Sequence, residues 1–221
     1  MDFINQERKG VVRMNVLILA ANGRIARIVE QRLLSDTNFN NINLTLVLRN
    51  SKRLVHLSDQ PRVNIIEGDI EDFDVVNRAM QGQDLVYVSN VDITHDNSIT
   101  LNVIQAMLNN NVKRVISSNA IGIYDEVQGE FGRINRDAID YVFTEIVNSE
   151  KLLVNSGLDY TILRLPWLND NEEINYTVTT RYQKFYGDYV SRKSVADLVL
   201  KIIDNPVYGL NDSLALAIPN K

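Results

Sequence analysis

The stretch "LILAANGRIARIVEQRLL" (residues 17–34) begins as an apolar run and continues with the spacing of an amphipathic helix. One glycine, Gly23, stands at the turn between the two parts. Such a turn can bind phosphate, because the free N–H groups and the dipole of a helix N-terminus attract anions. The usual dinucleotide motif has three glycines, and alanines take two of those places here. By itself the turn is equally compatible with a plain loop.

The rest of the chain alternates between strand-length apolar runs and helix-length amphipathic segments. The apolar runs are "NVLILA", "NLTLVL", "VNIIEG", "DLVYVS", "VKRVISS", "YTILRL" and "LALAI", and helices are expected over residues 24–35, 52–57 and 138–156, in "DFDVVNRAMQ" and in "SITLNVIQAMLNNN". This alternation is typical of a parallel sheet with helices on both faces. Right-handed crossovers then predict an α/β fold with a doubly wound, mostly parallel, Rossmann-like sheet.

Two segments depart from this pattern. Residues 175–190, "NYTVTTRYQKFYGDYV", alternate polar with β-branched or aromatic residues, which predicts a hairpin in a small C-terminal lobe of about residues 169–192. Residues 1–13 show neither helical nor strand periodicity, so we interpret them as an upstream extension or an expression remnant. Residues 14–221 are expected to form a single domain.

Composition narrows the class of protein. The 221 residues include no cysteine and only two histidines, His56 and His95, which argues against disulfides, thiolate chemistry and a metal site. The net charge of −5 and the lack of a basic run argue against nucleic acid as a partner. No apolar run approaches the roughly 20 residues of a membrane span, and the start lacks the apolar core of a signal peptide. We therefore expect a cytoplasmic protein without membrane contact.

Each position of the first turn has its own conformational requirement. Gly23 keeps the position nearest the phosphate path, where a Cβ would intrude. Ala26 is expected to face the strand, where one methyl group is tolerated. Ala20 implies an ordinary φ for the first turn residue, whereas Asn22 tolerates a left-handed conformation and can hydrogen-bond the loop. The turn therefore remains able to bind phosphate.

Several stretches, in order, resemble one known family. "LAANGRIARIVEQRLL", "LVLRNSKRL", "EGDIED", "VKRVISSNAIGIY", "SGLDYTILRLPWL" and "VSRKSVADLVLKII" are similar to segments of the atypical short-chain dehydrogenase/reductase group, the NmrA-like NAD(P)-binding proteins. The resemblance covers nearly everything after Met14. It implies a dinucleotide groove along the carboxyl ends of the strands.

The resemblance also implies which residues line that groove. They are Ala20, Asn22, Gly23, Arg24, Ile25, Arg49, Asp69, Ile70, Ser89, Asn90, Ser117 and Pro166. Residues 22–25 would wrap the pyrophosphate, and residues 69–70 would border the adenine. Residues 89–90 would line the path to the nicotinamide, whose far side Pro166 would cover. Asp69 is equally compatible with a helix N-cap ahead of "EDFDVV".

Arg49 bears on the choice of cofactor. NAD-preferring sheets carry an acidic residue at the end of the second strand, and NADP-preferring sheets carry a cation there. An arginine at this position, with Lys52 and Arg53 nearby, favours NADP(H), while NAD(H) remains possible. The alternative is a solvated basic start of a helix.

The catalytic residues of the superfamily are missing at the aligned positions. Its reductases pair a tyrosine with a lysine four residues later, and these positions fall on Val142 and Ile146. A shift of one residue offers Tyr141 and Glu145, but a carboxylate would raise the pKa of the tyrosine. The serine position falls on Asn119 or Ala120.

Few other residues are candidates for chemistry. Ser118 and Tyr124 are placed at the end of the fifth strand and remain weak candidates for substrate contact, although Tyr124 also suits a packing role. A loop histidine such as His95 is more often a surface residue. A serine hydrolase is disfavoured, because "GxSxG" is absent.

Two hypotheses remain from the sequence. The first is an NADP(H)-dependent oxidoreductase acting on a small molecule, in which the protein orients the cofactor and excludes water. The second is a non-catalytic dinucleotide sensor, which the missing tyrosine–lysine pair would allow.

Overall fold

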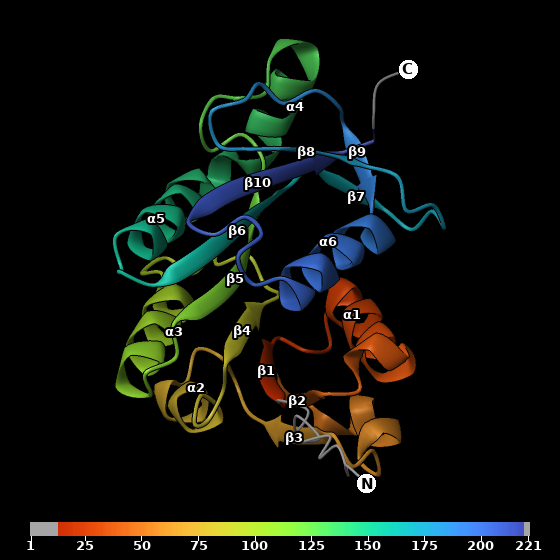
Figure 1. Ribbon diagram of the computed structural model, residues 1–221. Coiled ribbons are helices and arrows are strands. Elements are labelled where there is room, and N and C mark those ends of the chain that lie inside the picture. The colour runs from red at the N-terminus through yellow and green to blue at the C-terminus, as the bar shows by residue number, and fades with distance from the viewer. Residues whose placement is uncertain (1–12, 219–221) are drawn as a thin grey trace, which may run out of the picture.

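An eight-stranded sheet forms the centre of the protein, a computed structural model of which describes residues 13–218 (Figure 1). The strands are β1 (Met14–Leu19), β2 (Ile42–Leu48), β3 (Val63–Glu67), β4 (Leu85–Val88), β5 (Arg114–Ala120), β6 (Asp159–Leu165), β8 (Thr177–Thr179) and β10 (Asp212–Ala217). Their order in the sheet is β3-β2-β1-β4-β5-β6-β10-β8. Neighbouring strands from β3 to β10 are parallel, and β8 is antiparallel to β10. The predicted doubly wound, mostly parallel sheet is confirmed.

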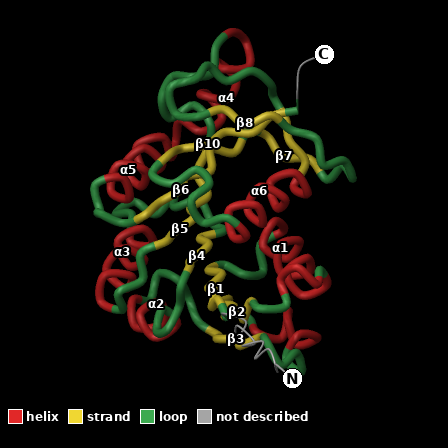
Figure 2. Tube along the Cα trace, viewed as in Figure 1, coloured by secondary structure: helices red, strands yellow, loops and turns green. Residues whose placement is uncertain are grey.

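Helices cover both faces of this sheet (Figures 1 and 2). On one face lie α1 (Arg24–Ser35) and α6 (Arg192–Asp204), and on the other lie α2 (Phe73–Ala79), α3 (Ser98–Asn109) and α5 (Phe143–Val154). Adjacent strand residues supply the two cores: Ile18 packs with the α1 and α6 side, and Leu17 packs with the α2 and α3 side. Strands buried on both faces explain the continuous apolar runs in the sequence.

The first helix has the predicted bounds, but the turn before it differs from our expectation. Ala20 has a φ of 58°, so the residue that was predicted to have ordinary φ adopts the left-handed region. The turn requires this because the Gly23 N–H donates to the Ala20 carbonyl at 2.9 Å and the Ala21 N–H donates to the Val47 carbonyl at 2.9 Å. The chain therefore leaves β1 sharply at an alanine, not at a glycine.

The helix predicted over residues 138–156 is wrong in its bounds. Three elements occupy this region: α4 (Gly129–Ile139), the 3-10 turn η3 (Asp140–Val142) and α5. Ile139 and Val142 have non-helical backbone angles, which separates the three. The physical reason is burial: α5 buries Ile146 and Leu153 against the sheet side, whereas α4 buries only Asn135, so one straight helix could not follow both surfaces.

The hairpin predicted over residues 175–190 is also wrong. β8 from this segment pairs with β10, and β9 (Tyr189–Ser191) pairs in parallel with β7 (Trp167–Asn169). Each strand thus finds a partner elsewhere in the chain. The loop between them packs tightly, since a Cβ on Gly187, whose φ is 129°, would lie 2.5 Å from the Cβ of Ala217.

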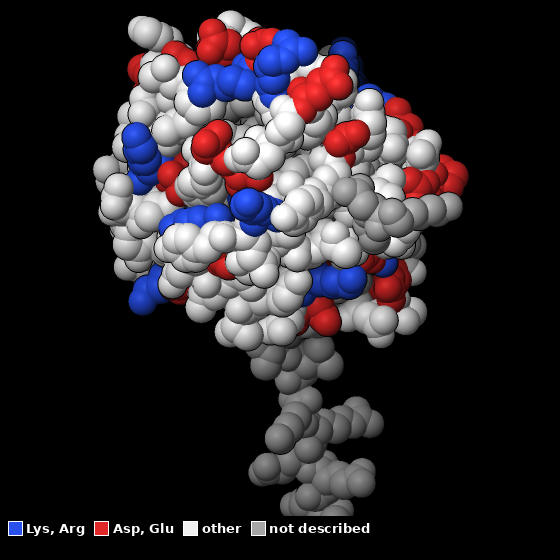
Figure 3. All heavy atoms as spheres, turned by 90° about the horizontal axis from the view of Figure 1, so that it is seen from above, with Lys and Arg blue, Asp and Glu red and all other residues white. Residues whose placement is uncertain are grey.

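Two further observations concern the surface. Basic and acidic side chains are interspersed on the face seen in Figure 3, as expected for a chain with no basic run. Within residues 13–218, no helix combines the length and the apolar character needed to cross a lipid bilayer.

The extension predicted for residues 1–13 lies outside the described residues except for Arg13.

Candidate functional site

A pocket of about 390 Å³ lies at the carboxyl ends of β1 to β4. Its lining residues are Ala20, Asn22, Gly23, Leu48, Arg49, Asn50, Arg53, Gly68, Asp69, Ile70, Glu71, Ser89, Asn90 and Ile99. The strand order reverses between β1 and β4, and open α/β sheets bind ligands at such a reversal. Topology therefore makes this pocket the candidate site.

The start of α1 borders the pocket and is open to an anion. No side chain caps this helix, and its first turn contains no acidic residue. The Gly23 φ of −60° is ordinary, so glycine is not needed here for its backbone freedom. A Cβ on Gly23 would instead lie 2.8 Å from Ser89 Oγ and 3.2 Å from the Ala20 carbonyl. Close approach between the ends of β1 and β4 thus requires a glycine at this position.

The side of the pocket beyond β2 is basic. Arg49 follows β2 directly, and Arg53 lies in the 3-10 segment η2 (Ser51–Leu57); both are exposed. Glu67, at the end of β3, fixes the start of η2 because it accepts hydrogen bonds from the Ser51 hydroxyl and from the Ser51 N–H, the latter at 2.8 Å. These bonds lower the pKa of Glu67, so the carboxylate stays ionised.

The end of β3 supplies the opposite wall. Asp69 lines the pocket, and its Oδ1 accepts a hydrogen bond from the Glu71 N–H at 3.1 Å. The cap of α2 is Asp72, which accepts from the backbone N–H groups of Asp74 and Val75. The alternative role of Asp69 as that helix cap is therefore wrong.

The pocket gathers many of the predicted groove residues. Ala20, Asn22, Gly23, Arg49, Asp69, Ile70, Ser89 and Asn90 all line it. Arg24, Ile25, Ser117 and Pro166 do not: the Ile25 side chain is buried, Ser117 lies in the middle of β5, and Pro166 directly follows β6. Contact of any of these residues with a cofactor stays a prediction.

Sequence reasoning missed several lining residues. Leu48 and Asn50 flank Arg49, and Gly68 precedes Asp69, so their place at strand ends was a usable signal. Ile99 comes from the first turn of α3, and no local pattern relates it to the turn after β1.

The arginine at the start of α1 faces the C-terminal segment. Arg24 pairs with Asp170 Oδ2, and Arg192, the first residue of α6, pairs with Asp170 Oδ1 at 2.9 Å. One carboxylate therefore links the first turns of α1 and α6. Binding of Arg24 to the pyrophosphate, as predicted from the sequence, would compete with its pairing to Asp170.

The two weak catalytic candidates lie outside the pocket. Ser118 is buried, with its Oγ 3.5 Å from the hydroxyl of Tyr87. Burial raises the pKa of Tyr87 to about 12. The Tyr124 hydroxyl donates a hydrogen bond to Glu150, and burial together with this bond raises the pKa of Tyr124. Among residues 13–218, no lysine is hydrogen-bonded to either hydroxyl, and the cation beside Tyr124 is Arg181, whose charge offsets only part of the rise in pKa.

The alignment shifted by one residue, which would make Tyr141 the catalytic tyrosine, does not agree with the structure. The Tyr141 side chain is 80% exposed in η3 and does not line the pocket. Glu145 lies 3.4 Å from Nδ1 of His95, whose side chain is fully exposed. His95 is thus a surface residue, as a single histidine in a loop most often is.

Comparison with known proteins adds to this geometry. The profile of a family described as NAD(P)H-binding matches residues 20–206. No curated protein is significantly similar to the chain. A Rossmann-fold NAD(P)-binding family protein from Shigella flexneri is 35% identical, with a TM-score of 0.75, and the match covers 94% of this chain and 95% of that chain.

Two less similar proteins share the fold. A short-chain dehydrogenase/reductase from Veillonella parvula DSM 2008, solved in complex with NADP, is 24% identical, with a TM-score of 0.87 and coverage of 94% of this chain and 95% of that chain. The anaerobilin reductase ChuY from Escherichia coli O157:H7 is 21% identical, with a TM-score of 0.79 and coverage of 94% and 98%.

Proposed function

The chain belongs to the NAD(P)H-binding family, in agreement with its resemblance to the atypical short-chain dehydrogenase/reductases, and from this premise we propose that it is an NADP(H)-dependent oxidoreductase acting on a small molecule. The observation that carries the choice of NADP(H) is Arg49, an exposed arginine directly after β2 in the wall of the pocket. The NADP found in the Veillonella parvula neighbour and the reductase activity named for ChuY support the proposal by analogy.

The residues of the pocket suit the parts of a dinucleotide. The uncapped start of α1 offers backbone N–H groups to a pyrophosphate. Arg49 and Arg53 offer guanidinium groups to a 2′-phosphate. Ile70 and Ile99 offer aliphatic surface to the adenine.

In the proposed reaction, NADP(H) supplies or accepts the hydride. The chain binds and orients the cofactor, and Ser89 and Asn90 at the end of β4 lead from the pyrophosphate toward the reacting end. No tyrosine–lysine pair holds the proton, because Val142 and Ile146 occupy those positions and the hydroxyl of Tyr124 is bound to Glu150. We propose that the proton exchanges with water at the site.

Titration with NADPH and NADH tests the choice of cofactor. A charge-assisted contact to the 2′-phosphate contributes about 1.5 to 3 kcal/mol, so Arg49→Ala should weaken NADPH binding by roughly tenfold or more and NADH binding little. Arg78→Ala removes an exposed cation from α2, outside the pocket, and should change neither affinity. Equal losses for both cofactors in Arg49→Ala would remove Arg49 from this role.

A non-catalytic dinucleotide sensor is the second candidate. The bond between Tyr124 and Glu150 favours it, because the Tyr124 hydroxyl donates its hydrogen to this carboxylate and not to a substrate. Turnover assays with NADPH on quinones and aldehydes separate the two: saturable binding of NADPH without any turnover would favour the sensor. A cytoplasmic location is part of either proposal, since the chain has no cysteine for disulfides.

A further inference from the structure

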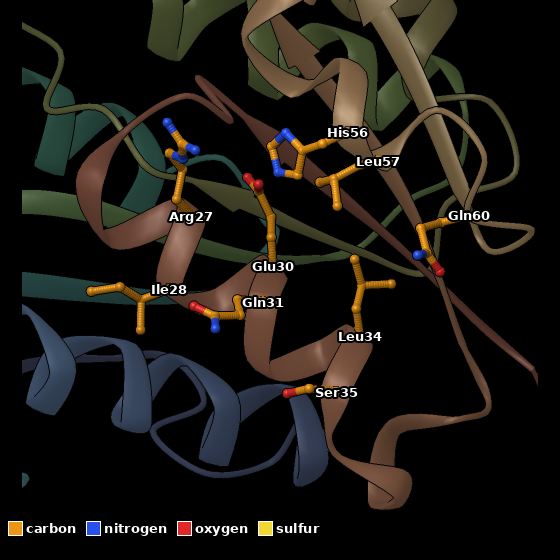
Figure 4. A pocket seen from close by; sticks show the side chains of 9 residues that line it. All are labelled: Arg27, Ile28, Glu30, Gln31, Leu34, Ser35, His56, Leu57 and Gln60. Atoms are coloured by element: carbon orange, nitrogen blue, oxygen red, sulfur yellow. The ribbon is translucent and has the colours of Figure 1, made fainter.

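A second hollow of about 520 Å³ lies between α1 and η2. It shares no lining residue with the dinucleotide pocket. Figure 4 shows Arg27 toward one end of this hollow, and Leu34 and Leu57 toward the other. We call this hollow the α1–η2 groove.

The polar side chains at the surface of the groove are without partners. Four of its lining residues are exposed and form no side-chain hydrogen bond or ion pair with the rest of residues 13–218: Arg27, Gln31, His56 and Gln60. A guanidinium group has five N–H donors and no acceptor, and each amide adds two donors for one acceptor. The groove therefore offers a ligand more donors than acceptors, which suits a ligand that accepts hydrogen bonds.

The charge that a ligand in the groove can touch is positive. Of the lining side chains, Arg27 is an exposed cation, whereas Glu30 is only 2% exposed and its Oε1 atom is fully buried, so a ligand does not reach it. Burial also raises the pKa of Glu30 to about 8, so this carboxyl group is mostly uncharged at neutral pH and repels an anion little. The groove thus favours a ligand with a single negative charge.

The other end of the groove is apolar. Leu34 lies two turns after Arg27 on α1, roughly 10 Å along the helix axis, and Leu57 belongs to η2. Both leucines are half-buried and pack against the core, so they form a fixed aliphatic surface. An extended chain of about six carbons, with about 1.5 Å per bond, covers most of that separation. A ligand of this shape places its charge on Arg27 and removes its alkyl chain from water.

We propose that the α1–η2 groove binds a small aliphatic monocarboxylate, whose carboxylate accepts hydrogen bonds from Arg27 and Gln31 and whose alkyl chain lies on Leu34 and Leu57. The planar guanidinium group of an arginine matches the two oxygens of a carboxylate. One accessible cation balances one negative charge, so a carboxylate suits the groove better than a phosphate ester, which carries nearly two. This site is separate from the dinucleotide pocket and does not depend on the cofactor.

Calorimetry with hexanoate, acetate, n-hexylammonium and hexyl phosphate tests this proposal. Hexanoate should bind saturably at one site per chain. Acetate, which lacks the alkyl chain, and hexylammonium, which Arg27 repels, should each bind at least tenfold more weakly. Absence of saturable hexanoate binding, or equal binding of hexylammonium, would overturn the proposal. Tighter binding of hexyl phosphate, or equal binding of acetate, would overturn the choice of an aliphatic monocarboxylate.

Three variants locate the site, and all three change exposed side chains, so the fold should be kept. Arg27→Gln removes the cation and should weaken hexanoate binding at least tenfold. Gln31→Glu places a carboxylate one turn from Arg27, where it competes with the ligand, and should cause a similar loss. The control is Arg78→Gln, which removes an exposed cation from α2 on the other face of the sheet and should change nothing. Full hexanoate affinity in Arg27→Gln or Gln31→Glu would contradict the assignment, whatever the outcome for NADPH.

Discussion

At the scale of single residues, the first turn shows that a glycine motif can be satisfied in more than one way. Ala20 accepts the left-handed conformation, and Gly23 accepts the close contact with Ser89. From the sequence, we expected a Cβ at position 23 to intrude on the phosphate path, whereas in the structure it would meet Ser89 and the Ala20 carbonyl. The ordinary φ predicted for Ala20 is wrong. Local sequence identifies a residue that tolerates positive φ, but it does not reveal how sharply the chain must turn to place the Gly23 N–H on the Ala20 carbonyl.

This conformation predicts a substitution that stabilises the protein. A left-handed φ costs a non-glycine residue about 1 to 2 kcal/mol, and glycine adds about 0.4 to 1 kcal/mol of unfolded-state entropy. Ala20→Gly should therefore raise the free energy of unfolding by up to about 1 kcal/mol, measured in urea. Ala21→Gly, at a fully buried neighbour without positive φ, should lower it. Equal losses in the two variants would show that Ala20 is not strained.

At the scale of elements, helix α1 was predicted best. Its apolar residues recur at helical spacing, and a strand and a short turn precede it, so local information was sufficient. The segment that contains β8 and β9 was predicted worst. β8 pairs with β10 and β9 pairs with β7, and neither strand pairs with the other as a hairpin would require. A polar–apolar alternation predicts a strand, but it does not identify the neighbour of that strand.

Helix α1 also predicts a dependence of stability on pH. The pKa of Glu30 is raised from 4.5 to about 8 in the folded protein, so folded Glu30 keeps a proton that the unfolded chain releases between these values. The free energy of unfolding should therefore decline from about pH 4.5 to 8 and level off above pH 8. Glu30→Gln should remove this decline, and urea unfolding of both proteins from pH 5 to 9 measures the difference. Parallel pH profiles would show that Glu30 is not protonated when folded.

A buried ion pair joins β6 to the loop after β5. Arg164 and Glu126 are 0% and 4% exposed, and Arg164 also donates to the carbonyl groups of Thr180 and Ser213. Removing one partner of a buried pair costs about 3 to 5 kcal/mol, so Glu126→Gln should lower the unfolding free energy by that order. The exposed pair Arg133–Asp137 provides the control, because Asp137→Asn should cost about 0.5 kcal/mol or less. A small loss in Glu126→Gln would mean that water reaches this pair.

At the scale of the whole molecule, the candidate site is formed by residues at the carboxyl ends of neighbouring strands. The residues that end β1 to β4 were predictable, because a parallel sheet brings its carboxyl ends to one edge. Contacts across the molecule were not predictable: the pairing of Arg24 with Asp170 joins residues far apart in the chain, and no local pattern indicates it.

That long-range contact predicts an effect on cofactor affinity. Asp170 holds Arg24 beside the proposed pyrophosphate position, so the carboxylate competes with the cofactor for this cation. Asp170→Asn should tighten NADPH binding by up to about fivefold at low salt, since an exposed pair contributes about 1 kcal/mol at most. The gain should fade as salt is added. Titration of NADPH at two salt concentrations measures it, and weaker binding in Asp170→Asn would show that the carboxylate instead supports the site.

The place of β10 has a consequence for how the chain is made. Within residues 13–218, β8 pairs with β10 alone, although β8 is synthesised earlier. A chain still on the ribosome therefore cannot complete the sheet until residues 212–217 have emerged. Until then, β6 presents an open edge of unpaired N–H and C=O groups, which readily pair with another chain. Premature termination just before Asp212 should consequently give an aggregating product and not a shortened, working protein.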